Sequence, residues 1–171
     1  MKKIDFRTDV LPLKNELYRL ALRITLNPAE AEDVVQETMI RVWNRREQWD
    51  EIESIEAFCL TICRHLALDR QKSAANQVAT LDDSHDTRDN SYSANPEEQA
   101  VQRDRIQLVR RLIDQLPEKQ RSCMQLRDIE GKSYKEIADV LEITEQQVKV
   151  NIFRARQTIR QKYQETEQYG L

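Results

Sequence analysis

The sequence predicts an all-α protein made of two small helical domains joined by a flexible linker. Its 171 residues include only two glycines and four prolines, so few positions suit the tight turns of β-hairpins. Several segments instead repeat apolar residues at three- and four-residue spacing, which is typical of amphipathic helices. One long polar stretch separates these segments. We therefore expect domains at residues 1–74 and 99–171, with the linker at residues 75–98.

The chain lacks the features of a membrane-spanning or secreted protein. No apolar run approaches the ~20 residues needed to cross a bilayer. The opening segment MKKIDFRTDV has no apolar signal sequence. We therefore expect a cytoplasmic protein without stable membrane insertion. Because the cytoplasm keeps thiols reduced, Cys59, Cys63 and Cys123 are expected to be buried thiols and not disulfides.

The first domain shows the periodic pattern of three helices. The first is expected at residues 13–26. The second runs over residues 27–46, and its start is marked by an Asn27 cap, a proline at the first helical position and Glu30. The third is expected at residues 54–72. The residues expected to face the core are Leu17, Leu20, Ala21, Ile24, Ala31, Val34, Val35, Thr38, Met39, Val42, Trp43, Ile55, Phe58, Ile62, Leu66 and Leu68.

The polar stretch QVATLDDSHDTRDNSYSANP, residues 77–96, has low hydrophobicity and no helical period. Residues 73–99 carry one basic and six acidic side chains. Such a composition is typical of a flexible tether. The alternative is a long surface loop within one domain, but loops of this length are uncommon in compact folds.

The second domain begins with a helix expected at residues 97–115. Pro117 opens another helix, which is expected to end near residue 129, and Gly131 provides the break that follows it. The next segment, residues 133–156, has the pattern of two short helices joined by a tight turn. The domain is therefore predicted to hold four helices.

Both helices of this last segment open with a capping box. Ser133 is followed three residues later by Glu136, and Thr144 by Gln147, so that side chains can bond the free amides of each first turn. The apolar residues expected to hold the two helices together are Ile137, Ala138, Leu141, Ile143, Val148 and Ile152.

The second of these helices has two different faces at about 100° per residue. One is apolar and holds Val148, Ile152, Ala155 and Ile159. The opposite face mixes amides, a cation and apolar groups, namely Gln146, Lys149, Val150, Phe153 and Gln157, and is flanked by Arg154, Arg156, Arg160 and Lys162. Residues 149–162 contain five basic and no acidic side chains, although the whole chain has a net charge of −3. Cations suit phosphates, whereas amides and apolar groups suit base edges. The pattern predicts a DNA-binding helix-turn-helix; the alternative is a helix pair with a solvated basic face.

Taken together, the two halves resemble a bacterial RNA polymerase sigma factor of the extracytoplasmic-function group, in the sigma-70 family. The resemblance lies in AEDVVQETMIRVW (residues 31–43), IEAFCLTICRHLALDR (55–70), LPEKQRSCMQLRDIEGKSYKEIADVL (116–141) and VKVNIFRAR (148–156). It implies a region-two domain, a linker and a region-four domain. It also implies that the protein binds core RNA polymerase and directs it to promoters.

The resemblance implies a polymerase-binding patch on the second helix. Asp33, Gln36 and Glu37 stand at i, i+3 and i+4, so they share one helix face. With Arg41 nearby, this patch would grip the β′ clamp of core polymerase. The expected partners also include the β flap, promoter DNA and an anti-sigma factor.

Recognition of the −10 element is implied for the end of the third helix. The residues concerned are Arg64, His65, Asp69 and Arg70, with Trp49 helping to wall the site. A flipped base needs hydrogen-bonding edges and a stacking surface. His65 stands where an asparagine is common in the family; it can stack and offer one donor, but lacks the paired donor and acceptor of an amide.

Recognition of the −35 element is implied for the second helix of the helix-turn-helix. The residues implied to face the major groove are Gln146, Lys149, Val150, Asn151 and Phe153, with Arg154 and Arg156 on phosphates. The angular position of Asn151 is nearer the core edge than that of the others. The family often has glycine in the turn, where this chain has Glu142.

Two other classes of protein were considered. An enzyme or metal protein could use Cys59, Cys63 and His65, but a fourth ligand is not evident, and neither a cofactor nor a metal is expected. A one-component helix-turn-helix repressor would normally dimerise on a palindromic site, and no dimerisation element stands out. The repressor is kept as the alternative function.

Overall fold

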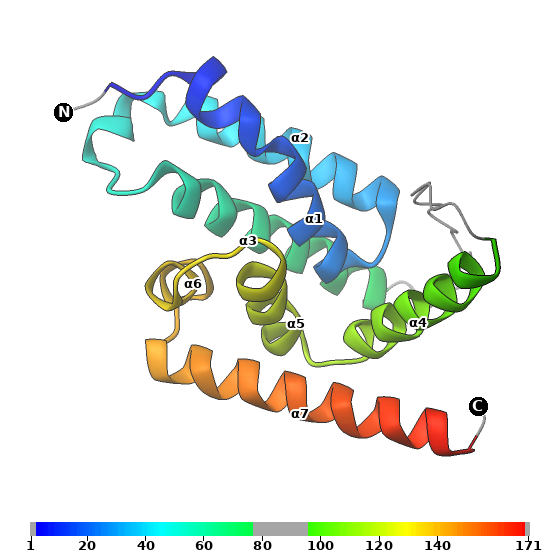
Figure 1. The fold of residues 1–171 in the computed structure, drawn as a ribbon. Coiled ribbons are helices and arrows are strands. Elements are labelled where there is room, and N and C mark those ends of the chain that lie inside the picture. Colours follow the sequence, from blue (N-terminus) through cyan, green and yellow to red (C-terminus); the bar gives the residue numbers. More distant parts are fainter. Residues whose placement is uncertain (1–2, 77–95, 170–171) are drawn as a thin grey trace.

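The computed structural model describes residues 3–76 and 96–169, and its regular elements within these ranges are all helical (Figure 1). This confirms the predicted all-α class. Helix α3 ends at Asn76 and helix α4 begins at Pro96. The predicted linker between them lies outside the described residues.

The first half is a bundle of three helices: α1 (Lys14–Thr25), α2 (Pro28–Asn44) and α3 (Ile55–Asn76). The Asn27 side chain accepts a hydrogen bond from the Glu30 amide at 3.1 Å, as the start signal of α2 predicted. Leu26 adopts a left-handed conformation with φ 56° and ends α1. Short π and 3₁₀ turns at Phe6–Val10 and Leu11–Leu13 precede α1. The core between the three helices buries Leu17, Leu20, Ile24, Val34, Val42 and Leu60.

An aromatic cluster covers one end of this bundle, and it corrects the prediction that Trp43 faces the core. Trp43 is 45% exposed. Its ring lies edge-on to Phe6 and to Trp49, and the Arg46 guanidinium lies 4.6 Å from its centroid. Trp43 is in the last turn of α2 and packs against Phe6 and Trp49, so it lies at the rim of the core and does not fill the centre.

The second half contains α4 (Pro96–Asp114), α5 (Glu118–Met124), α6 (Tyr134–Leu141) and α7 (Glu145–Tyr169). A π-helical turn, Gln125–Ile129, extends α5, so the single helix predicted for residues 117–129 is divided. Helices α6 and α7 form the predicted helix-turn-helix. In its turn, Glu142 adopts the left-handed conformation with φ 58°, a position where the family often has glycine.

Both helices of the helix-turn-helix begin with a capping hydrogen bond, and the second has the complete capping box. The Ser133 hydroxyl accepts a hydrogen bond from the Glu136 amide at 3.1 Å. At the next helix the exchange is reciprocal: the Gln147 amide donates to the Thr144 hydroxyl at 3.1 Å, and the Thr144 amide donates to the Gln147 side chain at 2.9 Å. These local bonds satisfy amides that a helix start leaves free.

The two halves pack directly against each other, which the sequence analysis left open. Helix α3 contacts α6, and α1 contacts α5, so that α5 and α6 lie between the first bundle and α7 (Figure 1). Buried apolar residues of both halves, such as Leu17 and Leu60 on one side and Leu126 and Ile137 on the other, belong to a single core cluster. The two predicted domains are therefore docked in this structure.

Candidate functional site

The outer face of α7 is the most exposed apolar and basic surface of the helix-turn-helix. Phe153 is 66% exposed, and Lys149 and Val150 are also exposed. On the opposite side of the same helix, Val148 and Ile152 are buried against α5 and α6. The rotation of α7 predicted from periodicity is therefore confirmed. The exposed residues from the predicted −35 set also include Gln146 and Arg154.

Two other residues predicted to contact the −35 element have partners within the protein. The Asn151 side chain is half-buried and donates a hydrogen bond to the Gln147 carbonyl at 2.8 Å. Arg156 forms an ion pair with Asp128 on the π-helical turn after α5, and this carboxylate raises the pKa of the guanidinium. Both side chains thus lie toward the edge of the α7 face that the exposed residues define.

Tyr134, at the start of α6, lies between a basic residue of the π-helical turn after α5 and one of α7, a role that the sequence analysis missed. Its ring lies 4.3 Å from the Arg127 guanidinium and 5.4 Å from the Lys149 ammonium group. An aromatic face attracts cations at such distances. Tyr134 therefore holds the Lys149 side chain near the start of α6.

The predicted polymerase-binding patch lies on one face of α2. Asp33 and Gln36 are exposed, and Glu37 is half-buried. Arg41, one turn further, donates a hydrogen bond to Glu37 at 3.0 Å. The spacing predicted from the sequence thus produces a shared polar surface.

Arg70 joins this acidic patch, although it was predicted to act with the −10 residues. Its guanidinium donates to Glu30 at 2.8 Å and lies 3.6 Å from both Asp33 and Glu37. These carboxylates raise the pKa of Arg70, with the Glu30 hydrogen bond as the main cause. Arg70 therefore connects the end of α3 to the start of α2.

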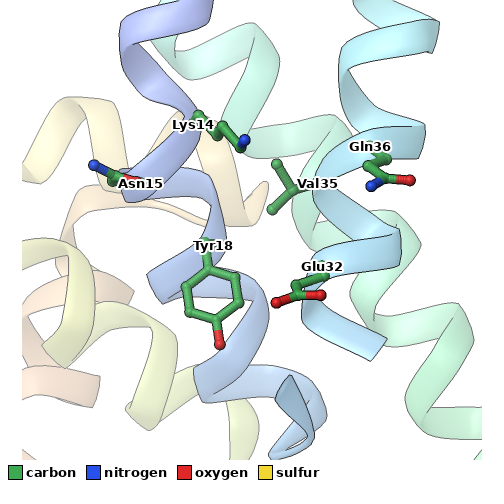
Figure 2. A pocket seen from close by; sticks show the side chains of 6 residues that line it. All are labelled: Lys14, Asn15, Tyr18, Glu32, Val35 and Gln36. Atoms are coloured by element: carbon green, nitrogen blue, oxygen red, sulfur yellow. The ribbon is translucent and has the colours of Figure 1, made fainter. Parts of the chain in front are cut away.

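A pocket of about 380 Å³ lies beside the α2 patch, between α1 and α2 (Figure 2). Gln36 belongs to both the pocket and the patch. The remaining lining residues are Lys14, Asn15, Tyr18, Glu32 and Val35. This hollow makes the surface around Gln36 concave.

A second, mainly apolar pocket of about 520 Å³ lies in the second half, and its lining includes Val109, Met124, Ile159 and Tyr163.

Arg64 and His65, predicted for −10 recognition, face the second half of the protein. Arg64 is only 6% exposed, and its Nε and Nη2 each donate to the Glu118 carboxylate at 3.0 Å. The Nε2 atom of His65 lies 2.6 Å from Glu142 Oε1. Asp69, one turn further along α3, is exposed.

Trp49 is separate from this group and belongs to the aromatic cluster. Its ring is buried and stacks on Phe6 at 6.4 Å between centroids. The indole N–H donates to the Val42 carbonyl at 3.1 Å. In this arrangement Trp49 is a core side chain whose polar atom is satisfied within the protein.

The junction between the halves contains further ion pairs that the sequence analysis did not anticipate. Arg19 pairs with Glu130, and Arg23 donates to Asp114 at 2.9 Å. These pairs join residues far apart in the chain, and helical periodicity carries no signal for them.

Lys132 is a largely buried cation of this junction with two carboxylate partners. Its ammonium group lies 2.6 Å from Glu56 and 2.9 Å from Glu16. Burial alone would lower the pKa of Lys132, but its two carboxylate partners raise it above the ordinary value. For Glu16, desolvation is the larger effect and raises the pKa.

The three thiols are all buried, as predicted. Burial raises the pKa of Cys59, Cys63 and Cys123 to about 12, so the thiol form dominates at neutral pH and these groups are poor nucleophiles. Within residues 3–76 and 96–169, no group of three or more His, Cys, Asp or Glu side chains could hold a metal ion.

Two family models match the two halves of the chain separately. The sequence profile described as "Sigma-70 region 2" matches residues 10–77, and that described as "Sigma-70, region 4" matches residues 106–159. The sigma factor SigL of Mycobacterium tuberculosis is 34% identical over 152 residues, covering 87% of this chain and 83% of SigL. The sigma factor SigX of Bacillus subtilis is 31% identical over 150 residues, covering 85% of this chain and 76% of SigX.

Solved structures share the fold. The sigma factor RpoE of Bartonella quintana, solved in complex with the anti-sigma factor NepR, superposes with a TM-score of 0.75 at 20% identity, over 92% of this chain and 95% of RpoE. CnrH, solved in complex with the cytosolic domain of CnrY, superposes with a TM-score of 0.67 at 19% identity, over 93% of this chain and 87% of CnrH.

The fold and the two matched regions define a sigma-70 type transcription factor. The chain belongs to the extracytoplasmic-function group of RNA polymerase sigma factors. Its function is to direct RNA polymerase to promoters, and the repressor alternative is not favoured. Among the helices that the structure describes, none is both long enough and apolar enough to cross a membrane.

Proposed function

We propose that this sigma factor reads the −35 element with the outer face of α7. The proposal rests on the two different faces of this helix: Phe153 and Lys149 are exposed to solvent, whereas Ile152 is buried in the core. A recognition helix needs an exposed mixed face on a rigid support. Lys149 contacts a base edge, Val150 and Phe153 make apolar contacts, and Arg154 contacts the phosphate backbone.

Two further residues act at the edge of this surface. Arg156 is held by Asp128, and it reaches phosphate when this ion pair is exchanged for one with DNA. Gln146 lies in the first turn of α7, where a side chain can approach the backbone or a base. Asn151, whose amide bonds the Gln147 carbonyl, has the smallest share in readout.

Core polymerase binds the α2 patch. Asp33, Gln36 and Glu37 form a polar surface next to the 380 Å³ pocket, which gives the partner both charge and shape to match. The partner surface is the β′ clamp, as in similar sigma factors. Arg70 and Arg41 hold the carboxylates of the patch in place.

The −10 element is contacted by α3, from its middle toward its C-terminal part. Arg64 and His65 supply a guanidinium and an imidazole that can pair with the non-template strand, and the exposed Asp69 lies on the same helix. Arg70 flanks this group. Trp49 acts indirectly, as a buried side chain of the aromatic cluster.

The remaining partners follow from the family. The second half contacts the β flap of the polymerase, and an anti-sigma factor binds the free protein, as NepR binds RpoE in the solved complex. The protein acts in the cytoplasm as a non-catalytic subunit of the polymerase.

Reconstitution with core polymerase tests this function. We expect the purified chain to give a stable complex with core enzyme and to start transcription at defined sites in a library of random promoters. A protein that bound a palindromic site without core enzyme, and gave no new start sites with it, would instead be a repressor.

A matched pair of variants tests the α2 patch. Asp33→Ala/Gln36→Ala/Glu37→Ala removes the patch, whereas Glu47→Ala/Gln48→Ala/Asp50→Ala removes exposed polar side chains elsewhere in the first half. Only the first is expected to weaken core binding.

A further inference from the structure

An aromatic residue from α6 lies at the edge of the exposed face of α7. Tyr134 is the first residue of α6 and directly follows the capping residue Ser133. The Lys149 ammonium group lies over its ring, 5.4 Å from the centroid. Lys149 is itself exposed on α7 and is the cation proposed to read a base. Both helices of the helix-turn-helix therefore contribute to this part of the face.

The Tyr134 ring has a fixed position. The Ser133 hydroxyl caps the first turn of α6, and the ring is half-buried against the hydrophobic core. The Arg127 guanidinium lies over the same ring at 4.3 Å. Arg127 is held in turn, because it donates a hydrogen bond to the Lys132 carbonyl at 2.8 Å. Tyr134 thus gives an exposed lysine a rigid neighbour.

Two cations of α7 are held in different ways. Arg156 forms an ion pair with Asp128, and this carboxylate neutralises its charge. Lys149 lies over an aromatic face, which attracts a cation but carries no net charge. An ammonium group has three N–H donors, so those that do not face the ring can bond to an acceptor on DNA. The contact with Tyr134 therefore directs Lys149 and leaves it able to bind.

The direction of this side chain matters for base recognition. A free lysine side chain has many rotamers, and fixing one of them on DNA costs conformational entropy. The acceptors of guanine in the major groove, N7 and O6, lie at fixed places, so the direction of the ammonium group decides which base pair it meets. A side chain that a rigid ring already directs loses less freedom on binding.

We propose that Tyr134 is a positioning residue for −35 recognition, whose ring directs the Lys149 ammonium group toward one base pair and so sets the selectivity there. This role rests on the proposed contact between Lys149 and a base edge. Tyr134 acts through its aromatic face and not through its hydroxyl group. A cation–π contact at an exposed site corresponds to a roughly two- to fivefold effect on an equilibrium.

Two substitutions separate the ring from the hydroxyl group. Tyr134→Phe keeps the aromatic face, whereas Tyr134→Leu removes it and retains an apolar side chain for the core. Each full-length variant is assembled with core polymerase and selected on a promoter library with a randomised −35 element. Tyr134→Leu should lower the base preference at the position that Lys149 reads by roughly two- to fivefold and leave the other positions unchanged.

Tyr134→Phe should select promoters like the wild type. The positioning role is overturned if Tyr134→Phe loses as much preference as Tyr134→Leu, because the hydroxyl group would then be responsible. It is also overturned if Tyr134→Leu weakens binding equally at all −35 positions, since a structural or phosphate-binding role would have that effect.

A double-mutant cycle shows whether Tyr134 acts through Lys149. Lys149→Ala identifies the position that this lysine reads. In the Lys149→Ala background, Tyr134→Leu should change selection at that position no further, because the group that it directs is absent. Losses that add in the double variant would show that Tyr134 contacts DNA independently, which contradicts the proposal.

Nuclear magnetic resonance measures the contact in the free, full-length protein. A nuclear Overhauser effect between the Tyr134 ring protons and the Lys149 ε-methylene protons is expected in the wild type, and its absence would overturn the proposal without any variant. The ring should also shift the ε-methylene resonance upfield, and Lys149→Ala assigns that resonance. The shift should persist in Tyr134→Phe and disappear in Tyr134→Leu. The control Tyr163→Leu, which removes another half-buried tyrosine of the second half, should leave it in place.

The same measurements distinguish failure of the positioning role from failure of the proposed function. If Lys149→Ala leaves −35 selection unchanged, the proposed base contact fails and the positioning role fails with it. If Lys149→Ala relaxes selection at one or two positions while Tyr134→Leu selects like the wild type, only the positioning role fails.

Discussion

At the scale of single residues, neighbouring positions on α7 serve opposite purposes. Ile152 is buried in the core, whereas the adjacent Phe153 is 66% exposed. A helix turns about 100° per residue, so adjacent side chains point in different directions. An exposed aromatic residue contributes little to folding but offers a large apolar surface to a partner. Substituting each residue in turn therefore distinguishes an effect on stability from an effect on DNA recognition.

Phe153→Ala is expected to change the free energy of unfolding by less than about 0.5 kcal/mol and to weaken −35 selection. Ile152→Ala is the matched control, and it should destabilise the protein by roughly 2–5 kcal/mol because it leaves a cavity. Chemical denaturation and selection from a randomised −35 library measure the two effects. A Phe153→Ala protein that unfolds easily while selecting promoters normally would show that Phe153 is a core residue.

Lys149→Ala and Arg154→Ala should change DNA binding in two different ways. Loss of a base contact at Lys149 relaxes preference at one or two −35 positions, at a cost of about 1–3 kcal/mol there. Loss of a phosphate contact at Arg154 weakens binding equally on all sequences and lowers the salt slope by about one. Holoenzyme binding to the promoter library at several salt concentrations distinguishes them. Identical profiles for the two variants would contradict the assignment.

At the scale of the element, the helix-turn-helix is specified by local chemistry. Capping hydrogen bonds start α6 and α7, and a left-handed residue ends α6. The turn carries a conformational cost, because Glu142 is not glycine and has φ 58°. The same side chain pairs with His65 across the junction. Glu142 therefore provides a partner for His65, although glycine would adopt this left-handed backbone conformation at a lower free-energy cost.

Substitutions at Glu142 separate these two effects. Glu142→Ala and Glu142→Gly both remove the carboxylate, but only glycine relieves the left-handed backbone. The glycine variant should therefore be more stable than the alanine variant by about 1 kcal/mol, as measured by denaturant unfolding. Equal stabilities would indicate that the turn rearranges when the side chain is lost.

Helix α2 presents a second element whose exposed face carries the proposed function. Asp33→Ala/Gln36→Ala/Glu37→Ala should lower the affinity for core polymerase while thermal unfolding changes little, since exposed substitutions usually cost less than about 0.5 kcal/mol each. A titration of labelled sigma factor with core enzyme measures the affinity. Full affinity in this variant would place the polymerase contact on another surface.

At the scale of the whole molecule, a continuous core joins two halves that sequence profiles treat separately. The core cluster contains buried residues from α1 to α3 and from α5 to α7. Ion pairs between side chains of the two halves add to these apolar contacts. We infer that the docked arrangement does not depend on the chain segment between the two halves.

Cleavage between the halves provides the corresponding experiment. With a specific protease site inserted between residues 77 and 95, the cut protein should elute from a size-exclusion column as one complex of two fragments. The apolar contacts and ion pairs of the junction remain after the cut, which is the reason for this expectation. In the Glu118→Arg variant the fragments should elute separately. Separation of the wild-type fragments would show that docking requires the intact chain.

The sequence alone determined the features that depend on near neighbours in the chain. Periodicity gave the all-α class, the rotation of α7 and most buried positions, and capping residues gave the starts of α2, α6 and α7. It also placed Asp33, Gln36 and Glu37 on one surface. These features follow from a period of 3.6 residues and from bonds that reach three or four positions.

Only the tertiary structure decided what the charged side chains meet. Arg64 pairs with Glu118 over 54 positions, and His65 with Glu142 over 77. Arg70 pairs with the acidic residues of α2, and Trp43 lies at the rim of the core beside Phe6 and Trp49. Charges attract at any sequence separation, so a linear pattern does not identify their partners. The docking of the two halves selects those partners.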